Sequence, residues 1–141
     1  MNEDTFANTK ILVVGGAGFV GSNLVLKLLE QQPDEVVVVD NLLSSEASNV
    51  PVSSKVNFMH GSITDDAILN AFPDDLGYVF HLACYHGNQS SIANPLADHE
   101  NNTLTTLKLF ERLKDVRNIN KVVYAAAGCA VAEKTHEDAV A

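Results

Sequence analysis

Three glycines spaced three residues apart, between a short apolar run and an amphipathic stretch, constrain the fold of this chain more than any other feature. The apolar run at 10–14 (KILVV) ends at the glycines and is typical of a strand buried on both faces. Residues 20–31 repeat apolar side chains at the spacing of one helix face. The segment between them is therefore predicted to be a glycine-rich turn from strand to helix, Gly15-Gly16-Ala17-Gly18-Phe19-Val20-Gly21.

The three glycines have separate roles in such a turn. Gly15 lets the chain leave the strand sharply, Gly18 lets backbone N–H groups approach a phosphate, and Gly21 lets the helix pack closely on the sheet. The N–H groups at the helix start, on Phe19 and Val20, would then face a pyrophosphate, whose negative charge the helix dipole favours. The turn therefore predicts a dinucleotide-binding site.

An acidic residue at the end of the second apolar run supports this prediction. Asp40 ends the run EVVVVD, nineteen residues after Gly21. A carboxylate at this position accepts hydrogen bonds from the adenosine ribose hydroxyls and repels a 2′-phosphate. Because no arginine follows closely to bind such a phosphate, the sequence favours NAD over NADP. The simpler interpretation is that Asp40 only caps a turn.

Short β-rich runs alternate with helix-like stretches along the chain, which predicts a parallel sheet with helices on both faces. The fold class is α/β, a Rossmann-type doubly wound sheet in strand order 3-2-1-4-5, with the chain ending soon after the fifth strand. Strands are predicted at 10–14, 35–40, 55–60, 78–82 and 121–125, and helices at 20–31, 65–71 and 95–114.

Composition and charge exclude several other classes. Nine Lys and Arg against eighteen Asp and Glu give a formal charge of −9 without a basic cluster, which argues against nucleic acid and anionic membranes as partners. No apolar run is long enough to span a bilayer, and the first ten residues do not read as a signal peptide, so a cytoplasmic protein is expected. We expect an incomplete NAD(P)-binding Rossmann domain at 10–132, a flexible N-terminus at 1–9 and a frayed end at 133–141.

The order of these motifs resembles the extended short-chain dehydrogenase/reductase family, in particular its NAD-dependent nucleotide-sugar epimerases and dehydratases of the UDP-glucose 4-epimerase kind. Besides the glycine loop, the segment 40–42 matches the family's Asp-Asn-Leu after the second strand. The segment 81–84 (HLAC) matches its His-Leu-Ala-Ala at the end of the fourth strand. Ser91, Pro95 and Asn102 follow at the family's spacing.

Two positions depart from the family pattern. Val14 stands where a Thr is usual, and Ser62 stands where the family has an acid that contacts adenine, which weakens that contact. The resemblance implies the cofactor NAD and these cofactor-binding residues: Gly15, Gly18, Phe19, Val20, Gly21, Asp40, Asn41, Ser62, Ile63, Leu82, Ala83, Cys84 and Asn102.

The family's catalytic residues have no match in this chain. Family members use a Tyr-x-x-x-Lys pair, but Leu, Gln and Gly stand four positions after Tyr78, Tyr85 and Tyr124. The family's Ser/Thr patch aligns with 125–128 (AAAG). The resemblance therefore covers the N-terminal portion only, and this portion is expected to bind NAD without turnover. A nucleotide sugar is expected only in a complete chain, and a homodimer is expected through the 95–114 helix.

Other interpretations remain open at this point. A non-catalytic NAD-binding or sensing module of the atypical reductase kind would also lack the Tyr–Lys pair. A steroid- or flavonoid-type reductase of the same family is disfavoured by Asp40. Cys84 and Cys129 are expected to be reduced thiols rather than a redox pair, and the scattered histidines predict no metal site.

Overall fold

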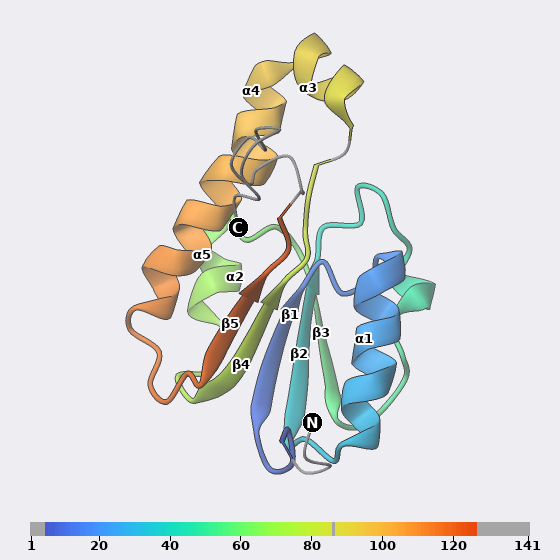
Figure 1. The fold of residues 1–141 in the computed structure, drawn as a ribbon, viewed down its shortest axis with the longest axis vertical. Coiled ribbons are helices and arrows are strands. Elements are labelled where there is room, and N and C mark those ends of the chain that lie inside the picture. The colour runs from blue at the N-terminus through green and yellow to red at the C-terminus, as the bar shows by residue number, and fades with distance from the viewer. Residues whose placement is uncertain (1–4, 86, 127–141) are drawn as a thin grey trace, which may run out of the picture.

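The computed structural model describes residues 5–85 and 87–126, and its centre is a five-stranded parallel sheet in the order β3-β2-β1-β4-β5 (Figure 1). The doubly wound order expected from the alternating pattern is thereby confirmed. The order reverses beside β1, where a crevice forms at the carboxyl ends of the strands. The strands are β1 Lys10–Val14, β2 Glu35–Asp40, β3 Val56–His60, β4 Leu76–His81 and β5 Lys121–Tyr124.

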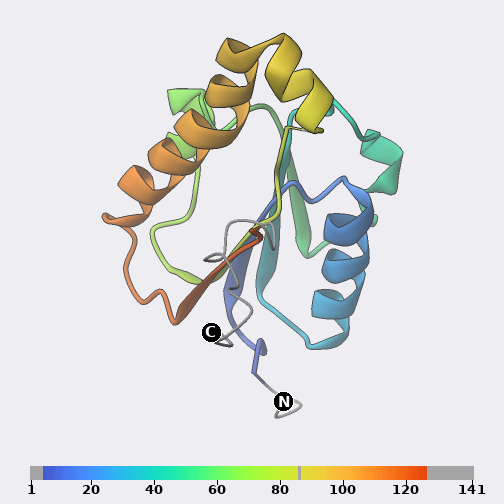
Figure 2. The same cartoon turned by 45° about the horizontal axis from the view of Figure 1, so that its top comes forward.

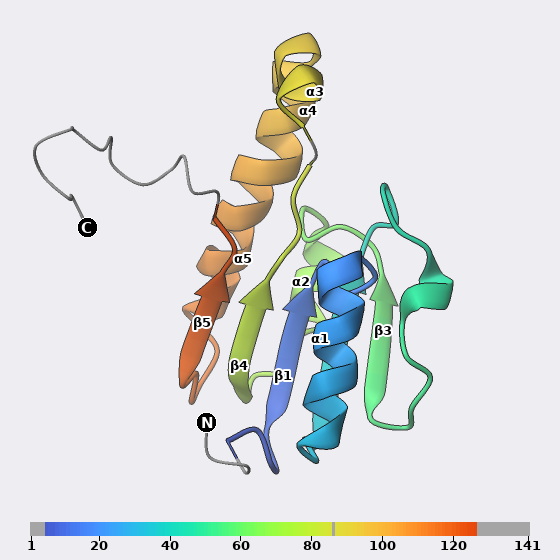
Figure 3. The ribbon, with the colours of Figure 1, turned by 45° about the vertical axis from the view of Figure 1, so that its right-hand side comes forward.

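Helices cover both faces of this sheet. The first helix, α1, lies on one face over β1 and β2, while α2 and α5 lie on the other (Figure 3). Viewed with the top turned forward, α1 and the helical arm that ends in α5 stand on opposite sides of the strands (Figure 2). The helical segments are α1 Phe19–Glu30, a 3₁₀ turn Ala47–Asn49, α2 Asp66–Asn70, α3 Asn88–Ala93, α4 Pro95–Asp98, a π-helical segment His99–Leu104 and α5 Thr105–Leu113.

The centre of the sheet is buried on both faces. Residues 11–14 of β1 and 36–39 of β2 are 2% exposed or less, as their continuous apolar runs predict. Alternate side chains of each strand enter different clusters, so Leu12 packs towards α2 and α5 whereas Val13 packs towards α1. This rigid centre holds the strand ends at which the cavity described below opens.

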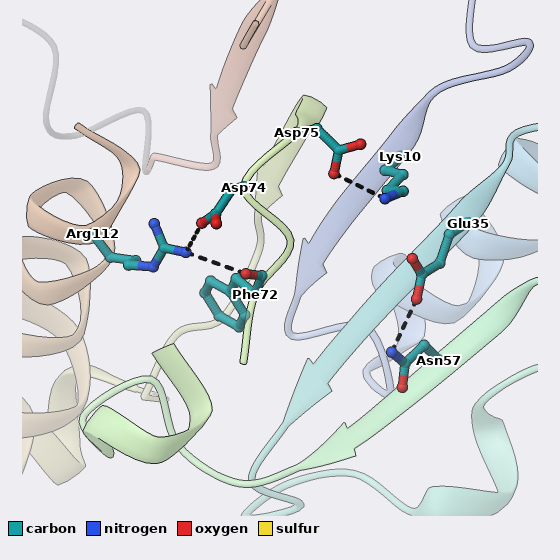
Figure 4. Close-up of polar contacts among 7 residues, drawn as sticks. All are labelled: Lys10, Glu35, Asn57, Phe72, Asp74, Asp75 and Arg112. Atoms are coloured by element: carbon teal, nitrogen blue, oxygen red, sulfur yellow. Dashed lines mark hydrogen bonds and ion pairs between the residues drawn. The ribbon is translucent and has the colours of Figure 1, made fainter. Parts of the chain in front are cut away.

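Arg112 on α5 attaches this helix to the segment that precedes β4 (Figure 4). Its guanidinium donates hydrogen bonds to the backbone oxygens of Leu69 (3.0 Å) and Phe72 (3.2 Å), and it pairs with Asp74 at 2.7 Å. The side chain is 13% exposed. The bonds reach carbonyl groups at and just beyond the C-terminal end of α2, where the oxygen of Leu69 also accepts the backbone N–H of Phe72.

Most predicted element boundaries agree with the structure to within one residue, and two elements differ by more. β4 begins at Leu76, two residues before the predicted start. The prediction stopped short of Gly77 because glycine is a poor strand former, but Gly77 is buried inside the strand. The helix predicted at 95–114 is three consecutive segments, since His99–Leu104 winds as a π-helix between α4 and α5. The short helix α3 was not predicted.

The N-terminal segment contacts the sheet where it is described. Phe6 packs edge-on against Tyr78 of β4, with 4.8 Å between ring centroids. The Thr9 hydroxyl donates a hydrogen bond to the backbone oxygen of Phe6. The interpretation of 1–9 as flexible stays a prediction. The 133–141 tail, Cys129 and positions 127–128 of the Ala-rich patch lie outside the described residues, as does His86.

Candidate functional site

A cavity of about 260 Å³ opens at the carboxyl ends of β1, β2 and β4. It lies where the strand order reverses, which is the ligand position expected for this architecture. All of the expected cofactor-binding residues line it except Asn102. The sequence did not single out these further lining residues: Leu43, Ser44, Ser45, Tyr85, Asn101 and Thr105.

The glycine loop forms one wall of the cavity, and two of its glycines are required by packing. Gly15 has φ +83°, and a Cβ there would lie 2.6 Å from the backbone N of Ala83. A Cβ on Gly21 would collide with the backbone oxygen of Gly15. A side chain at either position would displace backbone, so the close contact of the loop with α1 and with the segment after β4 depends on both glycines.

Gly18 differs from the other two because the protein itself leaves room for a side chain there. A Cβ on Gly18 would meet only the oxygen of Gly15, at an ordinary 3.5 Å, and its φ of −71° suits any residue. Gly18 is the N-cap of α1, whose first N–H groups, on Phe19 and Val20, have no acceptor within the helix. The missing side chain therefore leaves these donors open to the cavity.

Asp40 joins the glycine loop to the loop that follows β2. Its Oδ2 accepts a hydrogen bond from the backbone N–H of Ala17 at 2.9 Å. Its Oδ1 accepts from the N–H of Leu42 and from the Ser45 hydroxyl, both at 2.9 Å. Asp40 is 9% exposed, so this carboxylate is buried against hydrogen-bond donors and keeps one edge at the cavity. A carboxylate has about four acceptor positions, and three are used here.

The Asp40 bonds combine the two interpretations made from sequence, a turn cap and a ligand residue. The bond to Leu42 closes a tight turn in which Leu42 takes φ +58°, a conformation that costs a bulky residue energy unless its surroundings hold it. The acid therefore shapes the loop and also faces the cavity.

Ser62, in the segment that follows β3, also lines the cavity, as does its neighbour Ile63. Its Oγ accepts a hydrogen bond from the backbone N–H of Thr64 (3.2 Å) and lies 2.8 Å from the Thr64 hydroxyl. The hydroxyl is thus engaged with its own loop. It supplies no negative charge where the family pattern has an acid.

The segment after β4 forms the second wall, from Leu82 to Tyr85. Asn102, on the π-helical segment, does not line the cavity but bonds to the backbone of Tyr85. Tyr85 itself lines the cavity, but Gln89 stands four residues later, where a Tyr-x-x-x-Lys pair would have lysine. The other tyrosines, Tyr78 and Tyr124, are not followed by a lysine at this spacing either. Cys84 is exposed and is a free thiol.

His81, at the end of β4, is buried beside this wall and is 1% exposed. Its Nε2 lies 3.0 Å from the Thr106 hydroxyl, and its ring contacts Tyr124 with 5.3 Å between centroids. Its Nδ1 has no hydrogen-bond partner among the described residues. Burial lowers the pKa of His81 below 6.5, so the ring is neutral at pH 7.

Two absences hold for the part of the chain that the structure describes. No group of three or more His, Cys, Asp or Glu side chains there is arranged to hold a metal ion. No helix there is long and apolar enough to cross a membrane.

Comparison with solved structures gives matches with the same fold. WbmF of Bordetella bronchiseptica in complex with NAD⁺ is 61% identical with a TM-score of 0.85, over 95% of this chain and 41% of WbmF. WbmF in complex with NAD⁺ and UDP is 60% identical with a TM-score of 0.86, over 96% of this chain and 41% of that one.

Comparison with curated proteins finds UDP-glucose 4-epimerases. The enzyme of Halalkalibacterium halodurans is 34% identical over 125 residues, which are 87% of this chain and 36% of the enzyme. That of Yersinia enterocolitica is 33% identical over 130 residues, 87% of this chain and 38% of the enzyme. The chain thus spans less than two fifths of the length of these two relatives.

A sequence model of one family matches nearly the whole chain, over residues 11–141. The match begins in β1 and includes the glycine loop, Asp40 and both walls of the cavity. The chain belongs to the NAD dependent epimerase/dehydratase family.

Proposed function

We propose that this chain binds NAD in the cavity at the carboxyl ends of β1, β2 and β4. The observation that carries the proposal is Gly18: packing does not require a glycine there, but an open path to the N–H groups of Phe19 and Val20 does. These donors suit the pyrophosphate of a dinucleotide. The complexes of WbmF with NAD⁺ support the same cofactor.

The cofactor-binding residues named from sequence keep this role in the proposal, except Asn102, whose role is considered below. Asp40 would accept hydrogen bonds from the adenosine ribose through its remaining acceptor position. A 2′-phosphate would meet this buried carboxylate, and no arginine or lysine lines the cavity among the described residues. NAD should therefore bind more tightly than NADP.

The chemistry we propose belongs to a longer protein that contains this portion. When bound, NAD would supply a hydride acceptor and donor for a sugar carbon, as in an isomerase that oxidises its substrate transiently. The substrate class would be a nucleotide sugar, in keeping with the UDP bound by WbmF and the UDP-glucose 4-epimerases. The described residues supply no Tyr-x-x-x-Lys pair, so this chain by itself should bind the cofactor without turnover.

The proposal includes an organisation for the chain. The Rossmann domain is taken as 10–132, and a cytoplasmic location is proposed. A homodimer through the 95–114 helix is supported by apolar side chains that this arm exposes, Leu96 (80%), Leu107 (60%) and Phe110 (41%). Sedimentation of the chain tests this, since a sharp monomer peak at high concentration would contradict the dimer.

Calorimetric titration with NAD and NADP tests the binding proposal. We expect NAD to bind at a ratio of one per chain, and NADP to bind at least about tenfold more weakly because of Asp40. Circular dichroism of the same sample shows whether the chain is folded. A folded chain that binds no NAD at millimolar concentration would refute the proposed function.

A further inference from the structure

The wall formed by residues 82–85 carries no secondary structure, yet it is held by two hydrogen bonds from one side chain. The backbone N–H of Tyr85 donates to Oδ1 of Asn102 at 2.6 Å. The Nδ2 of Asn102 donates to the backbone oxygen of Tyr85 at 3.3 Å. One amide side chain thus pairs with both polar backbone groups of one residue, as a neighbouring strand would.

The orientation of this amide is fixed by Asp98. Its Oδ1 accepts a hydrogen bond from Nδ2 of Asn102 at 2.8 Å and another from the Ser91 hydroxyl at 2.7 Å. An ionised carboxylate only accepts hydrogen bonds, so the NH₂ group of Asn102 must face it. The carbonyl oxygen of the amide is thereby turned towards the N–H of Tyr85.

The backbone of Asn102 is held as firmly as its side chain. Its carbonyl oxygen accepts hydrogen bonds from the hydroxyls of Thr105 (3.0 Å) and Thr106 (2.7 Å). The same oxygen also accepts the backbone N–H of Thr105, where the π-helical segment ends, so the two hydroxyls add to a backbone bond. Thr106 is itself in contact with buried His81, at the end of β4. The amide is therefore presented from a rigid support.

Both amide hydrogens of Asn102 are used within the protein, one by Asp98 and one by Tyr85. The side chain does not line the cavity, whereas Tyr85 does. We propose that Asn102 is a positioning residue: it orders the wall formed by residues 82–85, which receives the cofactor, and does not itself contact the cofactor. The inference rests on the proposed function, because the ordered wall matters only if a dinucleotide occupies the cavity.

The test compares variants of the chain by two measurements, amide hydrogen exchange without ligand and affinity for NAD and AMP. Asn102→Leu keeps the approximate size and removes all three side-chain hydrogen bonds. Thr103→Ala is the matched control, because Thr103 lies next in the same segment and is exposed. AMP is a second probe, since it would occupy only the end near Asp40 and Ser62 and would not need the second wall.

In Asn102→Leu we expect the Tyr85 amide to exchange at least about tenfold faster while the amide of Val13 in β1 is unchanged. The affinity for NAD should fall about tenfold, and that for AMP should change less than about twofold. Thr103→Ala should match the unaltered chain in every measurement. A direct ligand role would lower NAD affinity without changing the exchange of Tyr85 in the free protein, and that result would overturn the proposal.

A rescue experiment separates positioning from general damage. Asn102→Asp places a carboxylate against Asp98 and should weaken NAD binding and speed exchange of Tyr85. Adding Asp98→Asn restores a donor opposite the new acceptor and should recover part of both losses, because the Tyr85 oxygen still lacks its donor. A double variant as weak as Asn102→Asp would contradict the assignment. If the unaltered chain binds no NAD, the proposed function fails. The exchange rate of the Tyr85 amide in Asn102→Leu would still show whether Asn102 orders this segment.

Discussion

The two walls of the cavity are built in different ways. The glycine-loop wall is shaped by backbone packing: Gly15 and Gly21 leave no space for a Cβ, and Asp40 closes the loop from a buried strand. The wall after β4 is shaped by side chains, since Asn102 pairs with the backbone of Tyr85 from a separate helical arm. At Gly15 and Gly21 the first wall cannot change without displacing backbone, whereas we expect that the second wall can loosen while the sheet stays folded.

This difference predicts how substitutions divide between stability and binding. Changes in the first wall should act on folding wherever a glycine is required by packing, and on binding alone at Gly18. Changes in the second wall and its helical arm should act through hydrogen bonds, with smaller effects on folding.

The largest effect is expected from Gly21→Ala, because its Cβ would collide with the backbone oxygen of Gly15. We expect a loss of about 3 kcal/mol in the free energy of unfolding, or no folded protein. Urea denaturation followed by circular dichroism measures it. Gly18→Ala is the matched control and should change stability by less than about 0.5 kcal/mol while weakening NAD binding. Equal stability losses in the two variants would contradict the distinction between these glycines.

A smaller loss is expected from Arg112→Leu, which detaches α5 from the end of α2. The substitution removes the side-chain donor from the oxygens of Leu69 and Phe72, although the Leu69 oxygen keeps the N–H of Phe72, so we expect a loss of about 1–2 kcal/mol in the free energy of unfolding. Lys27→Ala removes an exposed ion pair with Glu30 and should leave unfolding unchanged. Equal urea midpoints for the two variants would show that the Arg112 hydrogen bonds do not contribute to stability.

Acid should lower the stability of the folded chain through His81, at the end of β4. Its pKa in the folded protein lies below 6.5, the value for an exposed histidine, because burial disfavours the charged ring. The unfolded chain therefore binds the proton more readily, and the His81 contribution is complete above pH 6.5 and lost as the pH falls below it. Urea midpoints measured on both sides of this pH should fall on the acid side. His81→Asn should reduce this fall, and an unchanged pH dependence in that variant would exclude His81 as its source.

The smallest effect is expected from Ser62→Asp, which supplies the acid that the family pattern has beside adenine. An aspartate can also accept the hydrogen bond from the N–H of Thr64, so the loop should keep its shape. NAD affinity should rise a few-fold, within about 1 kcal/mol. A calorimetric titration with unchanged or weaker affinity would show that adenine does not lie at this position.

The sequence predicted the sheet and the first wall well because their causes are local in the chain. Continuous apolar runs mark β1 and β2, and the glycine spacing marks the turn. The role of Asn102 could not be predicted, since its partners Tyr85 and Asp98 come together only once α3 and α4 are in place, with Ser91 of α3 bonded to Asp98. Ser45 was missed for a similar reason, because its bond to Asp40 depends on the turn at Leu42.

A magnetic resonance titration of the isotopically labelled chain with NAD tests the central claim most directly. We expect the amides of residues 18–21 and of 84–85 to shift together and to saturate at one NAD per chain, because both walls face the same cavity. In Gly18→Ala the chain should stay folded and the shifts should need a higher NAD concentration. Shifts confined to other surfaces, or no shifts at millimolar NAD in a folded chain, would contradict the account.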